Sequence, residues 1–276
     1  MSGTQSFLDK IIETKQQRLA RMMSERPLAD VRAAAGTVRR TATPHALLSA
    51  LAHAGQCNII AELKRASPSK GELRRELAPA AVARAYEAGG AAAISVLTEE
   101  DYFLGSLADL RAVRAAVALP VLRKDFIVGE WQVYETAAAG ADALLLIVAA
   151  LADETLAHLR RLTEDELGMD ALVEVHTLDE LRRAEACGAR LVGVNNRNLH
   201  TFAVSLETSV ELIAARQTDA RFVSESGLRT SADLERLHAL GFDGFLIGET
   251  FMRAAEPGAA LRALREQAEI CERKQL

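Results

Sequence analysis

Short apolar segments alternate with helix-forming segments eight times along the chain, and this regular order constrains the fold more than any other feature. The apolar segments cover residues 57–64, 92–98, 121–126, 143–148, 171–176, 191–197, 221–226 and 244–249. Stretches rich in Ala, Leu, Arg and Glu lie near 80–89, 105–117, 131–139, 153–166, 178–187, 206–216, 231–239 and 257–268. Alternating strands and helices predict βαβ units with a parallel sheet. Eight such units fit an α/β fold of the closed (β/α)8 TIM-barrel type.

An open, doubly wound sheet is the alternative arrangement of these units. That fold usually carries a Gly-x-Gly-x-x-Gly fingerprint after its first strand. Here the first apolar segment runs into Arg65-Ala66-Ser67-Pro68-Ser69-Lys70-Gly71 instead. Helix ends are marked by glycines at Gly89, Gly90, Gly140, Gly168, Gly188 and Gly241 and helix starts by Thr177, Ser205 and Thr230. The sequence therefore favours the barrel.

The segment before the first strand is expected to form a helical extension. Residues 7–23 place Phe7, Leu8, Ile11, Ile12 and Leu19 on one helical face, which predicts an amphipathic helix packed on something larger. A second short helix is expected over 44–53. Because no linker divides the chain, we interpret residues 1–276 as one domain, with an extension over 1–55 and a barrel over 56–270.

Composition and charge exclude several classes of protein. The chain has 276 residues, of which 49% are hydrophobic and 4% aromatic, so we expect a large aliphatic core. A net charge of −5 argues against a nucleic-acid partner. A local cluster of basic side chains could still bind a small anion, and it consists of Lys64, Arg65, Lys70, Arg74 and Arg75.

Neither a membrane segment nor a metal site is expected. The most apolar run, 141–151, is too short to span a bilayer, and the charged N-terminus is unlike a signal peptide. Cys57, Cys187 and Cys271 are far apart and lack metal-ligand spacing. We therefore expect a cytoplasmic protein with reduced thiols and without a membrane partner.

Charged residues interrupt the apolar segments near their carboxyl ends, where TIM barrels place their active sites. The residues on the expected inward face, or at the strand ends, are Glu62, Lys64, Lys124, Glu174, Asn195, Glu225 and Glu249. A charge inside a parallel strand is unfavourable unless it is paired, so their convergence indicates a site. Arg123 and Asp125 are expected to face the helices and pair structurally, and Asn196 to be structural. His176 either binds a ligand or has a capping role at the rim.

Two further features suggest a phosphate group. Ser226-Gly227 and Gly248-Glu249-Thr250 lie after the last two strands, where such barrels bind phosphate through backbone N–H groups. Residues 67–71 add hydroxyls and a lysine after the first strand. The residues alone thus predict a phosphate-ester enzyme that uses Lys and Glu for acid–base chemistry and needs no metal.

The order of these motifs resembles the indole-3-glycerol phosphate synthase family over essentially the whole chain. The matching motifs are IIAELKRASPSKG (59–71), LTEEDYF (97–103), RKDFIV (123–128), LVEVH (172–176), GVNNRNL (193–199), SESG (224–227) and FLIGE (245–249), together with LDKII (8–12). The resemblance implies ring closure, decarboxylation and dehydration of 1-(2-carboxyphenylamino)-1-deoxyribulose 5-phosphate, without a cofactor. This is the indole-forming step of tryptophan biosynthesis.

The resemblance also implies roles for individual residues. Lys124 would be the general acid, Glu174 the general base, and Lys64 would lie near the substrate carboxylate. The implied catalytic set is Glu62, Lys64, Lys124, Glu174, Asn195 and Ser226. The implied substrate-binding set is Ser67, Phe103, Phe126, Arg197, Glu225, Gly227, Gly248 and Glu249.

Three alternatives remain open at this point. A Schiff-base aldolase would use Lys124 or Lys64 as a nucleophile. A phosphoribosylanthranilate isomerase would use a Cys/Asp pair, although Cys57 begins its strand rather than ending it. A non-catalytic scaffold would have no use for inward lysines opposite glutamates. Under each of the enzyme hypotheses the partner is a small phosphorylated substrate. The protein is expected to be a monomer or weak homo-oligomer.

Overall fold

Eight parallel strands close into a barrel in the computed structural model, which describes residues 6–53, 56–68, 70–74, 76–199 and 201–273. The strands are β1 (Ile59–Leu63), β4 (Ala93–Leu97), β5 (Val121–Lys124), β6 (Ala143–Ile147), β7 (Asp170–Val175), β8 (Leu191–Asn195), β9 (Arg221–Glu225) and β10 (Gly244–Ile247). Each pairs with the next in the chain, and β10 pairs with β1 through registers such as Ile60 to Leu246. This confirms the TIM barrel and excludes the open sheet. Ser69, Arg75 and the side chain of Cys271 lie outside the described residues.

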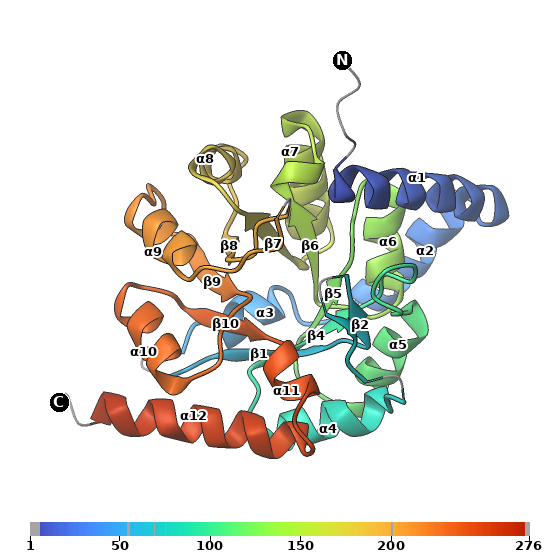
Figure 1. Ribbon diagram of the computed structural model, residues 1–276. Coiled ribbons are helices and arrows are strands. Elements are labelled where there is room, and N and C mark those ends of the chain that lie inside the picture. The colour runs from blue at the N-terminus through green and yellow to red at the C-terminus, as the bar shows by residue number, and fades with distance from the viewer. Residues whose placement is uncertain (1–5, 54–55, 69, 75, 200, 274–276) are drawn as a thin grey trace.

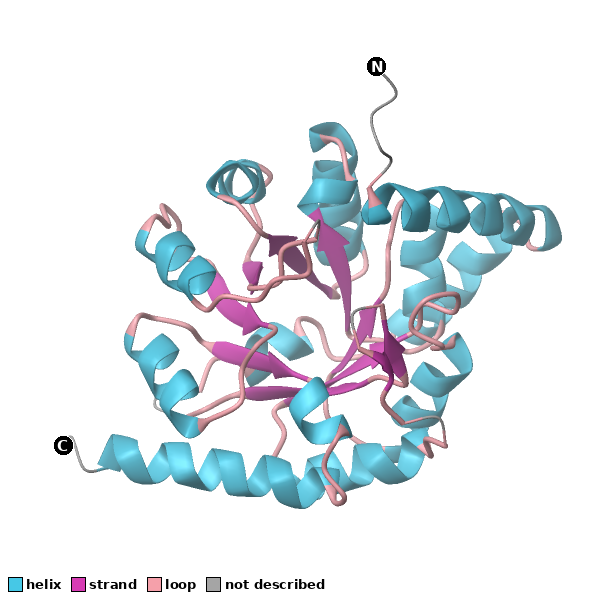
Figure 2. Cartoon of the chain, viewed as in Figure 1, coloured by secondary structure: helices cyan, strands magenta, loops and turns pink. Residues whose placement is uncertain are grey.

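Helices surround the barrel in the predicted order (Figures 1 and 2). They are α4 (Pro79–Gly89), α5 (Leu107–Ala116), α6 (Glu130–Ala138), α7 (Asp153–Arg161), α8 (Leu178–Ala186), α9 (Glu207–Ala214), α10 (Ser231–Ala239) and α12 (Pro257–Arg273). Residues 162–166, expected to continue α7, form one π-helical turn. The six glycines include five with positive φ, and only Gly89 remains in the helical conformation.

Side chains cap several of these helices as expected. Thr177 and Thr230 accept N–H bonds at the starts of α8 and α10. The cap at α9 lies one residue later than predicted, at Leu206, although the Ser205 hydroxyl still accepts a 3.3 Å bond from the Glu207 N–H.

The barrel interior is apolar at its amino end and charged at its carboxyl end. Inward side chains in the lower layers include Ile60, Leu122, Leu172 and Leu246, which pack together as one buried cluster. Side chains two residues further along their strands are inward too, because strand side chains alternate between faces. The alternation thereby carries acidic and basic groups to the upper rim.

Within the described residues 6–53, three helices precede the first strand, where the sequence indicated two. They are α1 (Phe7–Glu25), α2 (Leu28–Arg39) and α3 (Ala46–Ala50). The α3 helix closes the amino end of the barrel, because Leu47 and Leu51 join the inner apolar cluster. The unpredicted α2 packs on α6, with Arg32 over the ring of Tyr134. The α1 helix lies across the opposite rim of the barrel (Figure 1).

Short secondary-structure elements follow β1 and β10 at the carboxyl end of the barrel. A hairpin of β2 (Ala66–Ser67) and β3 (Gly71–Glu72) follows β1, in place of the expected loop. The last predicted strand is shorter than expected, because Gly248 caps a short helix, α11 (Glu249–Met252). In the described part of the chain, no helix has the length and apolarity needed to cross a bilayer.

Candidate active site

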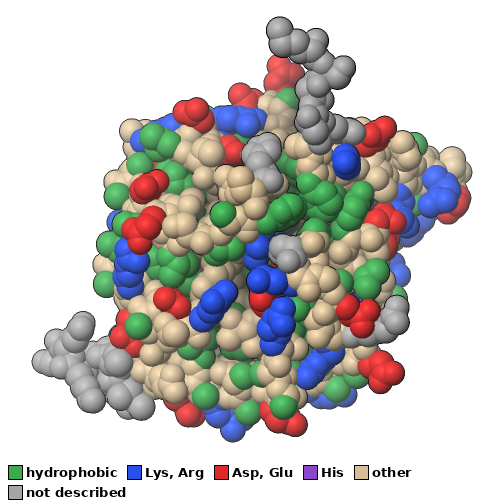
Figure 3. Space-filling model, in the orientation of Figure 1, with side chains coloured by type: hydrophobic (Ala, Val, Ile, Leu, Met, Phe, Trp, Pro, Cys, Tyr) green, Lys and Arg blue, Asp and Glu red, His purple; other side chains and the backbone are tan. Residues whose placement is uncertain are grey.

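A cavity of about 750 Å³ opens at the carboxyl end of the barrel. Figure 3 shows Lys and Arg side chains gathered around the hollow at the centre of this face, with hydrophobic side chains bordering it on the side of α1. Every site residue expected from the sequence lines this one cavity: Glu62, Lys64, Ser67, Phe103, Lys124, Phe126, Glu174, Asn195, Arg197, Glu225, Ser226, Gly227, Gly248 and Glu249. The structure thus brings the predicted residues together from seven of the eight strands or the loops after them.

Three carboxylates and two lysines form the floor of the cavity. Lys124 Nζ lies 2.9 Å from Glu174 Oε2 and 3.4 Å from Glu225 Oε2. Lys64 Nζ lies 2.5 Å from Glu62 Oε2. Glu62, Glu174 and Glu225 are all buried, so each carboxylate depends on these partners for its charge.

Two glycines make room for the buried carboxylates. A Cβ at Gly193 on β8 would lie 2.1 Å from Glu225 Oε1, and one at Gly248 would lie 2.1 Å from Glu62 Oε2. Neither glycine has a positive φ, so space rather than backbone conformation requires them. The carboxylates can therefore bend over the neighbouring strand and reach the lysines.

The charges around Lys124 separate the pKa values of the two glutamates. Burial alone raises the pKa of both, but Lys124 and His176 lie beside Glu174 and hold its pKa well below the usual range. For Glu225, burial is the largest effect, and burial together with the neighbouring Glu174 and Glu62 outweighs Lys124, so its pKa rises to about 7. Removal from water lowers the pKa of the partly buried Lys124, but its carboxylate neighbours outweigh this effect, raise the pKa and keep the side chain an ammonium ion. The site therefore combines a proton donor with an ionised acceptor.

Two aromatic rings form one wall of the cavity. The ring centroids of Phe103 and Phe126 lie 6.3 Å apart, and both residues border the cavity near Lys124. Phe103 follows β4, whereas Phe126 follows β5. Their relative position therefore depends on how the two loops are held.

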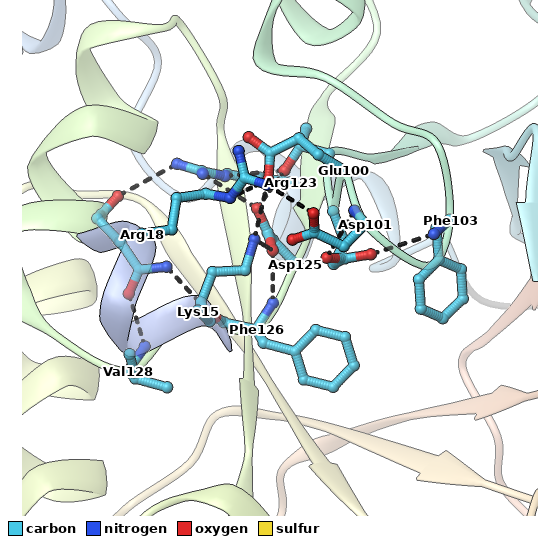
Figure 4. A network of polar contacts seen from close by, with 12 residues as sticks. Lys15, Arg18, Glu100, Asp101, Phe103, Arg123, Asp125, Phe126 and Val128 are labelled. Carbon is cyan, nitrogen blue, oxygen red and sulfur yellow. Dashed lines mark hydrogen bonds and ion pairs between the residues drawn. The ribbon is translucent and has the colours of Figure 1, made fainter. Parts of the chain in front are cut away.

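A polar network anchored by α1 holds both loops (Figure 4). The buried Lys15 Nζ lies 2.8 Å from Asp125 Oδ1, the atom that also accepts the Phe126 N–H. Lys15 and Arg18 pair with Glu100, and Arg18 also pairs with Asp101. The α1 helix is thus tied to the backbone beside both aromatic residues.

The same loop contains a group of acidic residues with a metal-like spacing, Glu99, Glu100 and Asp101. Their carboxylates already have partners within the chain. Glu99 accepts the N–H groups of Asp101, Tyr102 and Phe103, and the other two pair with Lys15 and Arg18. We therefore assign these residues to loop structure.

The opposite side of the cavity is suited to an anion. Ser226 and Gly227, both with positive φ, form a turn after β9, and the Asn196 side-chain amide donates to the carbonyl oxygens of Glu225 and Ser226 at its start. Gly248 and Glu249 begin α11, and the Glu249 carboxylate lies 3.2 Å from Arg253 Nε and 4.0 Å from Lys70 Nζ. Glu249 therefore balances cations at this end, while its backbone belongs to the expected phosphate turn.

Sequence-based roles for the structural residues are confirmed. Arg123 pairs with Asp125 at 3.1 Å and with Glu135 of α6 at 2.8 Å, facing the helices. Asn196 is buried and donates to the Ser224 hydroxyl as well as to the turn after β9. By contrast, Asn195 points into the cavity, and its Oδ1 accepts the Arg197 N–H.

Several residues that line the cavity were not predicted from the sequence. Phe7, Leu8 and Ile11 of α1 form part of the wall, and Arg229 and Arg253 add positive charge near the turn. The apolar face of α1 was recognised, but helical periodicity identifies a face and not its partner. Arg229 stands two residues after Gly227, and Arg253 stands five residues after Gly248, so their positions next to the expected phosphate turns could have indicated them.

Sequence comparisons match the chain to one family over most of its length. Residues 8–264 match the sequence model of the family "Indole-3-glycerol phosphate synthase". The chain is 46% identical over 262 residues to the indole-3-glycerol phosphate synthase of Carboxydothermus hydrogenoformans, covering 94% of this chain and 99% of the relative. It is 48% identical over 259 residues to that of Laribacter hongkongensis, covering 94% and 98%.

Solved structures of other proteins share the fold alone. A 3-hexulose-6-phosphate synthase from Salmonella typhimurium superposes with a TM-score of 0.62 at 15% identity, covering 78% of this chain and 99% of that one. A thiamine phosphate pyrophosphorylase from Pyrococcus furiosus gives 0.57 at 17% identity, covering 78% and 96%.

Proposed function

The chain belongs to the indole-3-glycerol phosphate synthase family, and on that premise we propose how its side chains divide the work of the reaction. The enzyme is a carboxy-lyase of tryptophan biosynthesis. It closes the pyrrole ring of 1-(2-carboxyphenylamino)-1-deoxyribulose 5-phosphate with loss of CO2 and water. The residue roles below are supported by the arrangement of charge and apolar surface in the cavity.

The substrate has three chemically distinct parts, and the cavity offers a matching surface for each. The aromatic ring fits against Phe103 and Phe126, with its carboxylate near Lys64. The phosphate fits the opposite end, where the backbone of Gly227 and Gly248 and the Ser67 hydroxyl lie near cationic side chains. Binding both ends folds the substrate, which brings the ring carbon toward the ketone carbon.

Lys124 is proposed as the general acid. A bond forms between the ring carbon that carries the carboxylate and the ketone carbon, while the Lys124 ammonium gives a proton to the ketone oxygen. The carboxylate then leaves as CO2, and the electron pair of the broken bond restores the aromatic ring. After Lys124 regains a proton from solvent, the new hydroxyl leaves as water with its help.

Glu174 is proposed as the general base of the final step. It takes the proton from the carbon between the ring nitrogen and the carbon that loses water, which completes the indole. Its position, 2.9 Å from Lys124 Nζ, places donor and acceptor on one side of the cavity. Glu62 and Asn195 orient Lys64 and the substrate hydroxyls, while Glu225, Ser226 and Arg197 complete the site.

The observation that carries this assignment is the ion pair between the partly buried Lys124 and the buried Glu174 at the carboxyl end of the barrel. It also disfavours Lys124 as a Schiff-base nucleophile, because a lysine whose pKa is raised by its neighbours stays protonated and is a poor nucleophile. The Cys/Asp isomerase pair is disfavoured too. Cys57 is buried ahead of β1, away from the carboxyl end of that strand.

The test is a Lys124→Met variant assayed by the fluorescence of indole-3-glycerol phosphate. We expect kcat to fall by about 10²- to 10⁴-fold, the usual contribution of a positioned acid, while the substrate still binds. Lys10→Met on the exposed face of α1 is the matched control and should behave like wild type. Near-wild-type turnover of Lys124→Met, or trapping of a substrate adduct by borohydride, would contradict the proposal.

We further propose a single domain over 1–276, with the extension over 1–55 and the barrel over 56–270, acting as a monomer or weak homo-oligomer. The exposed large apolar residues are scattered in sequence, as Met23, Leu104, Leu178, Val204 and Leu240. The thiol of Cys187, which forms no disulfide, supports a reducing, cytoplasmic location. Sedimentation analysis tests the oligomeric state.

A further inference from the structure

His176 lies on the side of Glu174 that faces away from Lys124. It follows β7 directly, two residues after Glu174, and only 9% of its side chain is exposed. Its Nε2 lies 3.3 Å from Glu174 Oε1, and its Nδ1 lies 3.0 Å from Glu180 Oε2 on α8. The same Glu180 oxygen accepts the His176 backbone N–H at 2.8 Å, which fixes the ring between two carboxylates.

The two carboxylates beside the ring favour its charged form. A neutral imidazole has one N–H, so one of its nitrogens would present a lone pair to a carboxylate oxygen. Only the imidazolium form offers an N–H to both Glu174 and Glu180. Burial on its own lowers the pKa of His176, but the two carboxylates outweigh burial and raise it to about 10.

Glu174 is therefore placed between two cations. Its Oε2 faces Lys124 of β5, and its Oε1 faces His176. The remaining charged groups nearby are Glu225 of β9 and the Glu62–Lys64 pair of β1. The carboxylates of Glu225 and Glu62 favour protonation of Glu174. The positive charge of His176 opposes this effect and favours the ionised form of Glu174.

The second cation has a chemical consequence. A buried lysine–glutamate pair can be neutralised by direct proton transfer from Lys124 to Glu174, which would remove both the acid and the base. A positive charge at His176 opposes that transfer, because it stabilises the ionised carboxylate. When Lys124 gives its second proton to the leaving hydroxyl, Glu174 loses one neighbouring cation and becomes a stronger base for the final step.

We propose that His176, held by Glu180, is a positioning residue that keeps the Glu174 carboxylate ionised and oriented for proton abstraction. The inference rests on the proposed role of Glu174 as the base. It assigns His176 a task within the reaction, where the sequence left ligand binding and a capping role open.

The principal test is the pH dependence of kcat in His176→Gln, whose amide can still donate a hydrogen bond but carries no charge. We expect kcat near neutral pH to fall about tenfold, with KM within about twofold, and the acid limb to move to higher pH by about one unit. Glu180→Gln should shift the limb in the same direction by less. His158→Gln on the exposed surface of α7 is the matched control and should leave both quantities unchanged.

A direct measurement complements the kinetics. Nitrogen-15 spectra of the histidine side chains, assigned with His176→Gln, should show both ring nitrogens of His176 protonated at pH 8. A neutral ring at that pH would overturn the proposal. So would a His176→Gln enzyme that is merely less stable, with the acid limb of kcat where the wild type has it.

The outcome for Glu174 separates this inference from the proposed function. If Glu174→Gln retains wild-type turnover, the assignment of the base is wrong and the role of His176 is lost with it. If Glu174→Gln is inactive while His176→Gln keeps the wild-type pH profile, only the inference about His176 is overturned.

Discussion

At the scale of single residues, the absence of a side chain at Gly193 decides where the Glu225 carboxylate can lie. The Glu225 oxygen occupies the space that a Cβ at position 193 would fill, and Leu172 closes that space from the other side. The site therefore depends on a residue that carries no functional group.

Replacing Gly193 by alanine should displace Glu225 from Lys124. We expect a loss of about 1–3 kcal/mol in unfolding free energy from overpacking, together with a larger loss of kcat/KM than this instability explains. Denaturant unfolding and steady-state kinetics measure the two effects. Gly36→Ala in α2 is the control, because its Cβ meets nothing within 4 Å and should stabilise the helix by about 0.5–1 kcal/mol. Unchanged kinetics in Gly193→Ala would show that Glu225 tolerates the new methyl group.

Glu225 and Glu174 should affect stability with opposite dependence on pH. Burial and the neighbouring carboxylates raise the pKa of Glu225 to about 7, above its value in the unfolded chain. The folded protein then binds the additional proton between about pH 4.3 and 7, so stability falls as the pH rises through that window. Glu225→Gln has no titrating carboxyl at this position and therefore does not lose stability in this window. The melting temperature of the variant should exceed that of wild type, and the excess should be larger at pH 8 than at pH 5.

For Glu174 the sign is reversed. Although burial raises its pKa, Lys124 and His176 depress it below the unfolded value, so its contribution is present at neutral pH and is lost on acidification. Glu174→Gln should therefore be less stable than wild type at pH 7, and the difference should narrow mainly as the pH falls below about 4.3, the pKa of an unfolded Glu. Melting curves of the two variants across this range test the pair, and parallel curves would contradict the separation of the two pKa values.

The alternation of strand side chains explains how these residues could be identified from the sequence. Glu62 with Lys64, and Lys124 with Phe126, lie two apart, so each pair had to share a face. The same alternation cannot identify ion-pair partners that lie on different strands. The 2.9 Å contact of Lys124 with Glu174 joins positions 50 residues apart, and local periodicity carries no information on that pairing.

At the scale of elements, α1 is a wall of the cavity as well as part of the N-terminal extension. Phe7, Leu8 and Ile11 border the cavity, and Lys15 anchors the helix to the loops after β4 and β5. Both loops carry an aromatic ring that we assign to substrate binding. The helix therefore influences ring placement without supplying an acid or a base.

A Lys15→Met variant tests this coupling. Methionine fills similar space but leaves Asp125 with Arg123 as its remaining cationic partner, so the backbone at Phe126 loses one restraint. We expect KM to rise about three- to tenfold, which corresponds to about 0.6–1.4 kcal/mol of binding free energy, while kcat changes less. Lys10→Met on the same helix is the control, since Lys10 is exposed. A fall in kcat with unchanged KM would assign Lys15 to chemistry or folding instead of ring placement.

The elements that could be predicted from the sequence are longer or more deeply buried than those that were missed. All eight barrel strands were expected because each is a buried, branched-aliphatic run bounded by helix signals. The α2 helix was missed because it buries only Val31 and Ala35, too few positions to define a period. The β2–β3 hairpin has two residues per strand, and α11 has four residues, so neither is long enough to leave a repeating pattern.

At the scale of the whole molecule, the local charge at the cavity mouth is opposite in sign to the net charge of the protein. The chain carries a net charge of −5, yet lysines and arginines gather around the mouth of the cavity (Figure 3). The proposed substrate bears a phosphate and a carboxylate, so the overall field repels it while the local field attracts it. Which field dominates at the mouth determines how fast the substrate is captured.

The dependence of kcat/KM on ionic strength distinguishes the two fields. Because the cationic residues lie at the mouth itself, we expect local attraction to dominate, so kcat/KM should fall as salt is raised while kcat changes little. Arg229→Gln, at the exposed edge of the cavity, should lower kcat/KM at low salt and flatten this dependence. Arg84→Gln removes the same charge from the exposed surface of α4 and should leave the salt dependence as in wild type. Equal effects of the two substitutions would mean that the substrate responds to net charge alone, and a kcat/KM that rises with salt would mean that repulsion by the whole molecule governs capture.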